Sequence, residues 1–346
     1  MTVLLSWGGV AFLVSFVLTV LVKRLALVYG AVDAPKKKKN IHTKPIARLG
    51  GLGIFISFSI VTLIVLLTSD SLTGGEISYV HYIGLLLGAA ILMIGGYFDD
   101  RYDLPAHIQI VSPFLAAVTA VAFGIGIEKL TNPLGGVIYL AAWQSNVLVF
   151  VWLMVVMYTT KFLDGLDGLA TSVTGVGALM IMLLSLTAAY YQPDVALLSA
   201  IVIGSLLGFL FWNFHPASIF LGEGGSTFVG FLLGSLAVIS GGKLATALLV
   251  LGIPLLDAMW VVLRRYRKGG IKKIFDGDRK HLHQRLFDLG LGQRRVVLLY
   301  VFIATVFGGA TLFLQSKEKM FALIILTLLM VLAAFFLSRK DSYESS

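Results

Sequence analysis

The chain contains no cysteine among its 346 residues, and only 13% of its residues are charged. Without cysteine it has no disulfide framework, no thiolate metal site and no cysteine nucleophile. Soluble domains are usually about a quarter charged, whereas hydrophobic residues make up 58% of this chain. This composition excludes a disordered protein, a fibrous protein and an ordinary cytosolic enzyme. Several apolar runs approach the roughly 20 residues that a helix needs to cross a bilayer. The sequence therefore predicts an all-α, polytopic membrane helix bundle.

The apolar runs predict eleven membrane spans within one domain, residues 1–338, followed by a polar tail at 339–346. The first run has no basic n-region and no evident cleavage site, so we expect a retained span and not a signal peptide. Turn residues in 126–143 predict a small hairpin between two spans. We expect the spans near residues 3–22, 50–68, 80–98, 109–125, 144–162, 168–189, 195–212, 226–240, 244–262, 296–314 and 320–338.

Basic residues lie mostly on one side of this predicted bundle. The connecting segments on that side, counted with the tail, carry 23 of the 27 Lys and Arg residues. Lys and Arg are enriched in cytoplasmic loops. The sequence therefore predicts an external amino terminus and a cytoplasmic carboxyl terminus. Four consecutive lysines at 36–39 suit anionic lipid head groups as well as topology.

Acidic residues gather at the same predicted membrane edge, where eight of the 18 occur in short clusters. The first cluster is Asp99, Asp100 and Asp103, with Arg101 among them. Like charges this close repel one another unless a cation lies between them. Mg²⁺ suits such a place because it takes oxygen ligands and is often shared with substrate phosphates. A solvated acidic loop is the alternative.

The second cluster, Asp164-Gly165-Leu166-Asp167-Gly168, lies between two predicted spans. Its carboxylates can cap the next helix, and free N–H groups at a helix start can also bind an anion. Two Asp-Gly pairs in five residues exceed the needs of capping. Lys161 lies three residues before Asp164, so it can pair with this cluster or be a buried structural group.

The third cluster is a glycine loop, Gly222-Glu223-Gly224-Gly225, followed by two hydroxyl residues. Backbone N–H groups of such a loop can cradle phosphate, although no Walker signature follows. A flexible turn is the alternative. Asn213 ends the preceding span, where it can bond a base edge or cap the helix.

The longest predicted cytoplasmic loop brings His281, His283 and Arg285 together. No four-ligand zinc set is visible, and His and Arg side chains suit a diphosphate, which Arg can bind with two hydrogen bonds. Lys44 and Arg48 in the first loop are further anion-binding candidates. A basic loop that faces lipid head groups is the alternative. Asp257, within a span, is either part of the site or a buried structural group.

Carboxylates for a hard cation, glycine loops and basic side chains on one membrane face indicate a metal-assisted phosphoryl transfer. The cation would neutralise the developing charge on the leaving phosphate, and a carboxylate would position or deprotonate the incoming oxygen. The sequence thus predicts transfer between a soluble nucleotide and a membrane lipid.

Five motifs in this order resemble the polyprenyl-phosphate N-acetylhexosamine-1-phosphate transferases, bacterial membrane enzymes that begin cell-envelope polysaccharide synthesis. The phospho-MurNAc-pentapeptide transferase of peptidoglycan synthesis is a more distant relative, because its run of consecutive histidines is absent here. The resemblance covers about Asp33 to Leu291. Its motifs are DAP…H..KPIARLGG at 33–51, GGYFDDRYDL at 95–104, LDGLDGLA at 163–170, NFHPASIFLGEGGS at 213–226 and HLHQR at 281–285.

The resemblance implies that a UDP-sugar and polyprenyl (undecaprenyl) phosphate give polyprenyl-diphospho-sugar and UMP, with Mg²⁺ or alternatively Mn²⁺. GlcNAc is the expected sugar, and other N-acetylhexosamines are alternatives. It implies a bacterial plasma membrane enzyme with its site on the cytoplasmic face. The implied residues are Asp99, Asp100, Asp164 and Asp167 for catalysis, Asp99, Asp100 and Glu223 for the metal, and Lys44, Arg48, Lys161, Asn213, His281, His283 and Arg285 for substrate.

Three positions depart from the pattern of the family. Glu223 stands where the family usually has Asp, and Lys161 stands where it usually has Asn, which unlike Lys can accept a hydrogen bond. In the first loop, Lys39-Asn40 and Ala47-Arg48 replace an Arg-Lys and a Pro-Arg pair. These departures bear on sugar specificity and on full activity.

Three other classes of function remain as alternatives. A transporter or flippase would use the membrane-edge acids as coupling sites, but the acids lie on one side and no inverted repeat is evident. A CDP-alcohol phosphotransferase would carry a longer Asp-rich signature. A non-catalytic relative is the third. No nucleic-acid module is visible, and a homodimer is an assembly that the sequence leaves open.

Overall fold

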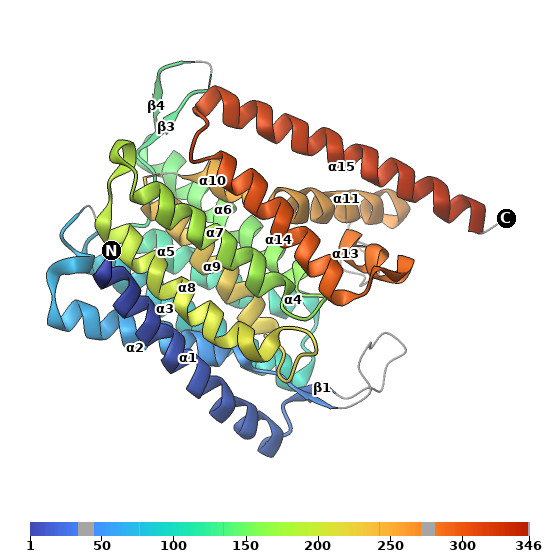
Figure 1. Cartoon of the computed structure of the whole chain (residues 1–346), viewed down its shortest axis with the longest axis horizontal. Helices are drawn as coiled ribbons and strands as arrows, with labels where there is room; N and C mark the ends of the chain where they lie inside the picture. Colours follow the sequence, from blue (N-terminus) through green and yellow to red (C-terminus); the bar gives the residue numbers. More distant parts are fainter. Residues whose placement is uncertain (34–44, 76, 134, 242, 271–280, 345–346) are drawn as a thin grey trace.

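The computed structural model describes residues 1–33, 45–75, 77–133, 135–241, 243–270 and 281–344, with side chains up to residue 332 except that of residue 268. Helices dominate this part of the chain, and they lie side by side in a bundle (Figure 1). The first half contains α1 (Thr2–Val28), α2 (Gly50–Thr68), α3 (Tyr79–Tyr102), α4 (Ala106–Gln109), α5 (Val111–Ala122) and α6 (Ala142–Leu163). The second half contains α7 (Leu169–Ser185), α8 (Pro193–Asn213), α9 (Glu223–Ile239), α10 (Leu244–Val250), α11 (Gly252–Gly269), α13 (Leu282–Leu286), α14 (Gln293–Ala310) and α15 (Ser316–Glu344).

Six described helices are long and apolar enough to cross a membrane, and a seventh span results if α10 and α11 count as one. These lengths and compositions confirm a polytopic helical membrane protein. Each of the eleven expected spans coincides with a helix or a helix pair, while the number that cross the bilayer stays a prediction. The expected span 244–262 is not one straight helix, because α10 and α11 are bent by 74° at their junction.

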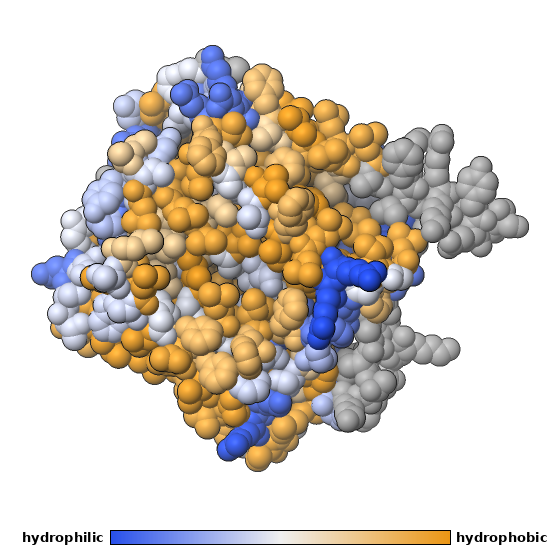
Figure 2. All heavy atoms as spheres, viewed as in Figure 1, coloured by the Kyte–Doolittle hydropathy of each residue, from blue (hydrophilic) through white to orange (hydrophobic). Residues whose placement is uncertain are grey.

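Hydrophobic side chains cover the middle of the face seen in Figure 2, and strongly hydrophilic side chains gather toward its edges. Exposed apolar residues are frequent on the outer helices, with Leu13 61% and Phe302 65% exposed. In water such a surface would be costly, whereas a bilayer solvates it. The apolar surface therefore agrees with a bundle surrounded by lipid.

Helix α9 occupies the centre of the bundle, because every residue from 224 to 238 is buried. Its glycines allow neighbouring backbones to approach closely. A Cβ at Gly96 of α3 would overlap the Cα of Gly224, and a Cβ at Gly51 of α2 would overlap the Cα of Gly225. Such small-residue contacts are typical of membrane helix packing. They place the first turn of α2 and the C-terminal part of α3 directly against the start of α9.

Two short antiparallel ribbons complete the fold. One pairs β1 (Val32–Asp33) with β2 (Ile46–Ala47), and Ala47 also forms a parallel bridge with Ile219. The other pairs β3 (Lys129–Thr131) with β4 (Val137–Tyr139), and this confirms the hairpin expected in 126–143. The first ribbon matters for function, because it connects the first loop to the segment that leads into α9.

Candidate active site

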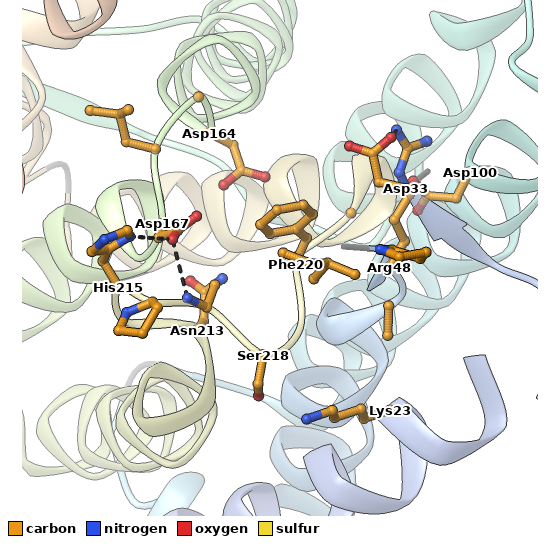
Figure 3. Close-up of a pocket in the computed structure, with 18 of the residues that line it drawn as sticks. Lys23, Asp33, Arg48, Asp100, Asp164, Asp167, Asn213, His215, Ser218 and Phe220 are labelled. Carbon is orange, nitrogen blue, oxygen red and sulfur yellow. Dashed lines mark hydrogen bonds and ion pairs between the residues drawn. The ribbon is translucent and has the colours of Figure 1, made fainter. Parts of the chain in front are cut away.

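The loops expected on the cytoplasmic side meet at one end of the bundle around a cavity of about 660 Å³. Its walls come from the end of α1, the first loop, the last turn of α3, the α6–α7 loop, the α8–α9 loop and the start of α14 (Figure 3). The predicted site residues that line it are Arg48, Asp100, Asp164, Asp167, Asn213 and Glu223. One cavity thus unites residues from four of the five sequence motifs.

The carboxylate of Asp100, a residue of α3, is bonded to the start of α9. The backbone N–H of Glu223 donates to both carboxylate oxygens of Asp100, at 3.2 and 3.1 Å. The first N–H groups of a helix lack partners within the helix and carry partial positive charge, so they stabilise a carboxylate there. The Gly96–Gly224 contact brings α3 close enough for this bond. Asp100 is therefore a fixed acidic group on the cavity wall.

Asp99 faces a different direction, toward a second cavity. Its carboxylate accepts hydrogen bonds from the N–H of Leu104 at 3.1 Å and from Nε2 of Gln109 at 3.0 Å. The Nζ atom of Lys161 lies 3.8 Å from its other oxygen. Asp99 is 6% exposed, so these partners largely replace water around it.

The second cavity, of about 430 Å³, is a groove with mainly apolar walls. Apolar side chains of α3, α4 and α5 form most of it, and Asp99, Gln109 and Lys161 form its polar end. Glu223 lines both this groove and the first cavity. Its carboxylate pairs with Lys161 at 3.0 Å, so a single ion pair lies where the two cavities meet.

Asp164 and Asp167 line the first cavity from the α6–α7 loop. Burial raises the pKa of Asp164 well above its ordinary value, and the negative charges of Glu223, Asp100 and Asp167 raise it further. Asp167 accepts hydrogen bonds from Nδ1 of His215 at 2.7 Å and from the N–H of Ala217 at 3.1 Å. Figure 3 shows Asp167 and His215 pointing toward each other. Asp167 therefore fixes the α8–α9 loop, which belongs to the fourth motif.

Asn213 lies in the wall with its side chain bonded within the protein. Its Nδ2 donates to the carbonyl of Ile219 at 3.0 Å, and its Oδ1 accepts from the hydroxyl of Thr171 at 3.2 Å. It is only 2% exposed. In this arrangement Asn213 shapes the α8–α9 loop, and its predicted contact with a uracil base stays a prediction.

The first loop contributes Arg48, which pairs with Asp33 at 2.9 Å and faces the cavity beside Asp100 (Figure 3). Arg48 supplies a positive charge on a wall that otherwise carries several carboxylates. The ribbon of β1 and β2 holds the pair in place. Lys44, also predicted as a binding residue, lies outside the described residues.

The histidine motif packs behind the α6–α7 loop and does not line the first cavity. Nδ1 of His281 bonds Asp257 at 2.9 Å, and the N–H of Leu282 donates to the same carboxylate at 3.0 Å. The His281 ring stacks on Phe162 and on the ring of His283. Asp257 is thus part of this cluster, and whether it serves the site or only the structure stays open.

His283 is almost completely buried against the third motif, 163–170. A Cβ at Gly165 would overlap its Nε2 atom, so only glycine fits beside this ring. Burial lowers the pKa of His283 to about 3, and the charge of His281 contributes. His283 is therefore a neutral packing partner of the loop. Arg285, together with Asp257, lines a third cavity of about 320 Å³ between α11, α13 and α15.

No three His, Asp or Glu side chains converge on a metal-binding point within the described part of the chain. The chemistry of the first cavity nevertheless suits a divalent cation. Besides burial, the negative charges of Glu223, Asp100 and Asp167 lie close enough to raise the pKa of Asp164. Mg²⁺ is usually bound by one or two carboxylates, several waters and the phosphates of a substrate. Asp100 and Asp164 fit that pattern, while Asp99 bonds Leu104 and Gln109 in the other cavity.

Several residues near the site were not predicted from the sequence. Gln109 bonds both Asp99 and Lys161, and Gln293 accepts a hydrogen bond from the N–H of Asp167 at 3.2 Å. Arg294 donates to the carbonyl of His215 at 3.0 Å. Neither Gln109 nor Gln293 belongs to a charged cluster, so no local pattern marks them. His215 lies inside the fourth motif, and its neighbour Pro216 could have drawn attention to it.

Comparison with known proteins identifies the family of the chain. The sequence model of glycosyl transferase family 4 matches residues 82–241, which include three of the five motifs. A Bacillus subtilis (strain 168) protein named "Probable undecaprenyl-phosphate N-acetylglucosaminyl 1-phosphate transferase" is 31% identical, over 93% of this chain and 89% of its own.

Two further relatives carry similar names. The decaprenyl-phosphate N-acetylglucosaminephosphotransferase of Mycobacterium tuberculosis (strain H37Rv) is 32% identical, over 88% of this chain and 80% of its own. The undecaprenyl-phosphate alpha-N-acetylglucosaminyl 1-phosphate transferase of Salmonella typhimurium is 27% identical, over 94% of this chain and 87% of its own. With the order of its motifs and an identity of 31% over nearly its whole length, the chain belongs to glycosyl transferase family 4.

Proposed function

We propose that this protein transfers N-acetylglucosamine 1-phosphate from UDP-N-acetylglucosamine to undecaprenyl phosphate and releases UMP. One observation carries the proposal. A polar cavity that suits a nucleotide sugar and an apolar groove that suits a lipid chain meet at the same residue, Glu223. The names of the relatives supply the reaction. The membrane would be the bacterial plasma membrane, with the site on its cytoplasmic face.

In this reaction an oxygen of the acceptor phosphate attacks the sugar-bound phosphorus of the UDP-sugar. The bond between that phosphorus and the bridging oxygen breaks, and the bridging oxygen leaves with UMP. A phosphate monoester near neutral pH is already largely ionised, because its second pKa is about 6. The site therefore needs to orient the attacking oxygen and to stabilise the charge on the leaving phosphate more than it needs a strong base.

The residues divide between the two substrates. Arg48 is placed to pair with the diphosphate. Asp167 holds the α8–α9 loop, which forms part of the wall of the nucleotide cavity. A magnesium ion held by Asp100 and Asp164, with Mn²⁺ as an alternative, would neutralise the diphosphate and the leaving UMP. On the other side of Glu223, Asp99 and Lys161 form the polar end of the lipid groove.

UMP release by the detergent-purified protein tests this function. Undecaprenyl phosphate, Mg²⁺ and, in separate reactions, UDP-GlcNAc, UDP-GalNAc and UDP-MurNAc-pentapeptide would be supplied. We expect release that requires both lipid and metal and that is fastest with UDP-GlcNAc. Absence of release with every donor, from protein shown to be folded, would refute the transferase and favour a non-catalytic relative or a transporter.

A further inference from the structure

Lys161 is a buried cation in the wall between the nucleotide cavity and the lipid groove. Its side chain is 15% exposed. Its Nζ atom lies 3.0 Å from Glu223, 2.9 Å from Oε1 of Gln109 and 3.8 Å from Asp99. These partners come from α9, α4 and α3, so three helices converge on one ammonium group.

The groove gives this ammonium access to a lipid. Its lining residues include Ile94 and Phe98 of α3 and Leu115 of α5, and all three are among the exposed apolar residues. In a bilayer these side chains face hydrocarbon, so a lipid chain can lie against them without crossing water. A lipid whose hydrocarbon chain lies there would bring its head group to the polar end of the groove, where Lys161 lies.

The hydrogen-bonding capacity of Lys161 fits an anionic guest. An ammonium group has three N–H donors. Within the described residues, Glu223 and Gln109 accept two of them at hydrogen-bonding distance, whereas Asp99 at 3.8 Å lies beyond it. The third donor is therefore available to an oxygen that arrives from the groove. Glu223 and Asp99 would otherwise repel a phosphate, and the ammonium offsets that repulsion.

We propose that Lys161 binds the phosphate of the lipid acceptor, and that Glu223 and Gln109 are positioning residues that hold its ammonium at the end of the groove. The inference rests on the proposed function for the identity of the acceptor. In this inference Glu223 orients Lys161, and the proposed metal ligands are Asp100 and Asp164. Lys161 and Glu223, two of the departures from the family pattern, thus act as one unit.

Kinetics on Lys161→Gln test the phosphate contact. We expect the KM for undecaprenyl phosphate to rise at least about 10-fold, because a hydrogen bond to a charged group is lost, with little change in the KM for the UDP-sugar. Lys161→Arg keeps the charge and should retain more of the affinity. Lys243→Gln is the matched control, because Lys243 is also buried but bonds Ser185 and Gln192 beyond the far end of α9. An unchanged acceptor KM in Lys161→Gln, with wild-type turnover present, would overturn the inference and leave the proposed function intact.

A binding measurement without turnover provides the second readout. Farnesyl phosphate should raise the thermal midpoint of the wild-type protein by at least about 2 °C at saturating concentration. Farnesol tests the lipid chain alone, and inorganic phosphate tests the phosphate alone. Neither should raise the thermal midpoint as much as farnesyl phosphate does. Lys161→Gln should lose the response. An equal response in that variant, or an equal response of the wild type to inorganic phosphate, would contradict a phosphate site at the end of the groove.

A double-mutant cycle separates the two roles of Glu223. If Glu223 acts through Lys161, the variant Glu223→Gln/Lys161→Gln should lose no more acceptor affinity than Lys161→Gln alone. Binding of Mn²⁺ to Glu223→Gln, followed by its electron paramagnetic resonance signal, should stay within about 3-fold of the wild type. Additive losses in the cycle together with a large loss of Mn²⁺ affinity would make Glu223 a metal ligand and not a positioning residue.

Discussion

Asp99 and Asp100 are consecutive residues of α3, yet their carboxylates open into different cavities. Asp100 accepts the N–H of Glu223 in the polar cavity, and Asp99 bonds Gln109 in the apolar groove. Consecutive helical residues point about 100° apart, so one turn of α3 can serve both sides of a partition. The pair therefore places one carboxylate in each of the two cavities.

Replacement of Asp100 by Asn should abolish turnover while the protein stays folded. The amide keeps the size of the side chain but removes the charge that would bind the metal, and we expect activity to fall by at least about 100-fold. UMP release and the thermal midpoint should be measured together. Asp103→Asn is the control, because Asp103 has a positive φ of 50°, which Asn tolerates. Near-normal turnover in Asp100→Asn would reject the assignment of this residue.

Gly96→Ala should destabilise the bundle, because the new methyl group would overlap the backbone of Gly224. Overpacking of this kind costs about 1–3 kcal/mol, and the displacement of α3 would also weaken the Asp100–Glu223 bond. Gly175→Ala is a suitable comparison, since no atom lies within 4 Å of the added Cβ. Thermal unfolding in detergent should show a lower midpoint only for the first variant; equal midpoints would contradict the close packing of α3 on α9.

The buried ring of His283 should make the protein sensitive to acid. Its pKa is about 3 in the folded protein and about 6.5 when unfolded, so protonation favours the unfolded state. Its contribution to stability is complete above pH 6.5 and is lost as the pH falls toward 3, by about 1.4 kcal/mol per pH unit. His283→Gln should flatten this acid dependence of the thermal midpoint, and His107→Gln, at an exposed residue, should not. The same slope in all three proteins would rule out the effect.

Asp257→Asn should disturb the site through His281. The carboxylate accepts both the Nδ1 of that ring and the N–H of Leu282, so it fixes the ring and the start of α13. We expect kcat to fall about 10-fold, because the free energy of one hydrogen bond to a charged group corresponds to about that factor. The double variant Asp257→Asn/His281→Asn should be no worse than the worse single variant. Additive effects on kcat would show that the two side chains act separately.

Hydropathy and local spacing were sufficient to predict much of this fold. Each apolar run became a helix or a helix pair, and the turn residues in 126–143 became the β3–β4 hairpin. The sharp bend between α10 and α11 was not predicted, because the run around Pro254 is apolar on both sides of it. The direction in which a helix leaves a bend depends on its packing partners, and a hydropathy profile does not contain them.

The motifs predicted which residues gather, but not how they are divided. Asp99 and Asp100 look like one metal pair in the sequence, and only the contacts of α9 and α4 show that they face different spaces. Gln109 reaches Lys161 from 52 residues away. The histidine motif packs behind the α6–α7 loop, and its expected place near the diphosphate stays a prediction. Each of these relationships depends on tertiary contacts between distant segments.

The buried position of α9 restricts which helices can gain or lose residues. Its 17 residues span about 25 Å, at 1.5 Å per residue, which is less than the roughly 30 Å of a bilayer's hydrocarbon core. One inserted residue would rotate half of α9 by about 100° and move its glycines away from α2 and α3. Homologues in thicker or thinner membranes are therefore expected to vary at outer helices such as α1, with 27 residues, while the length of α9 stays constant.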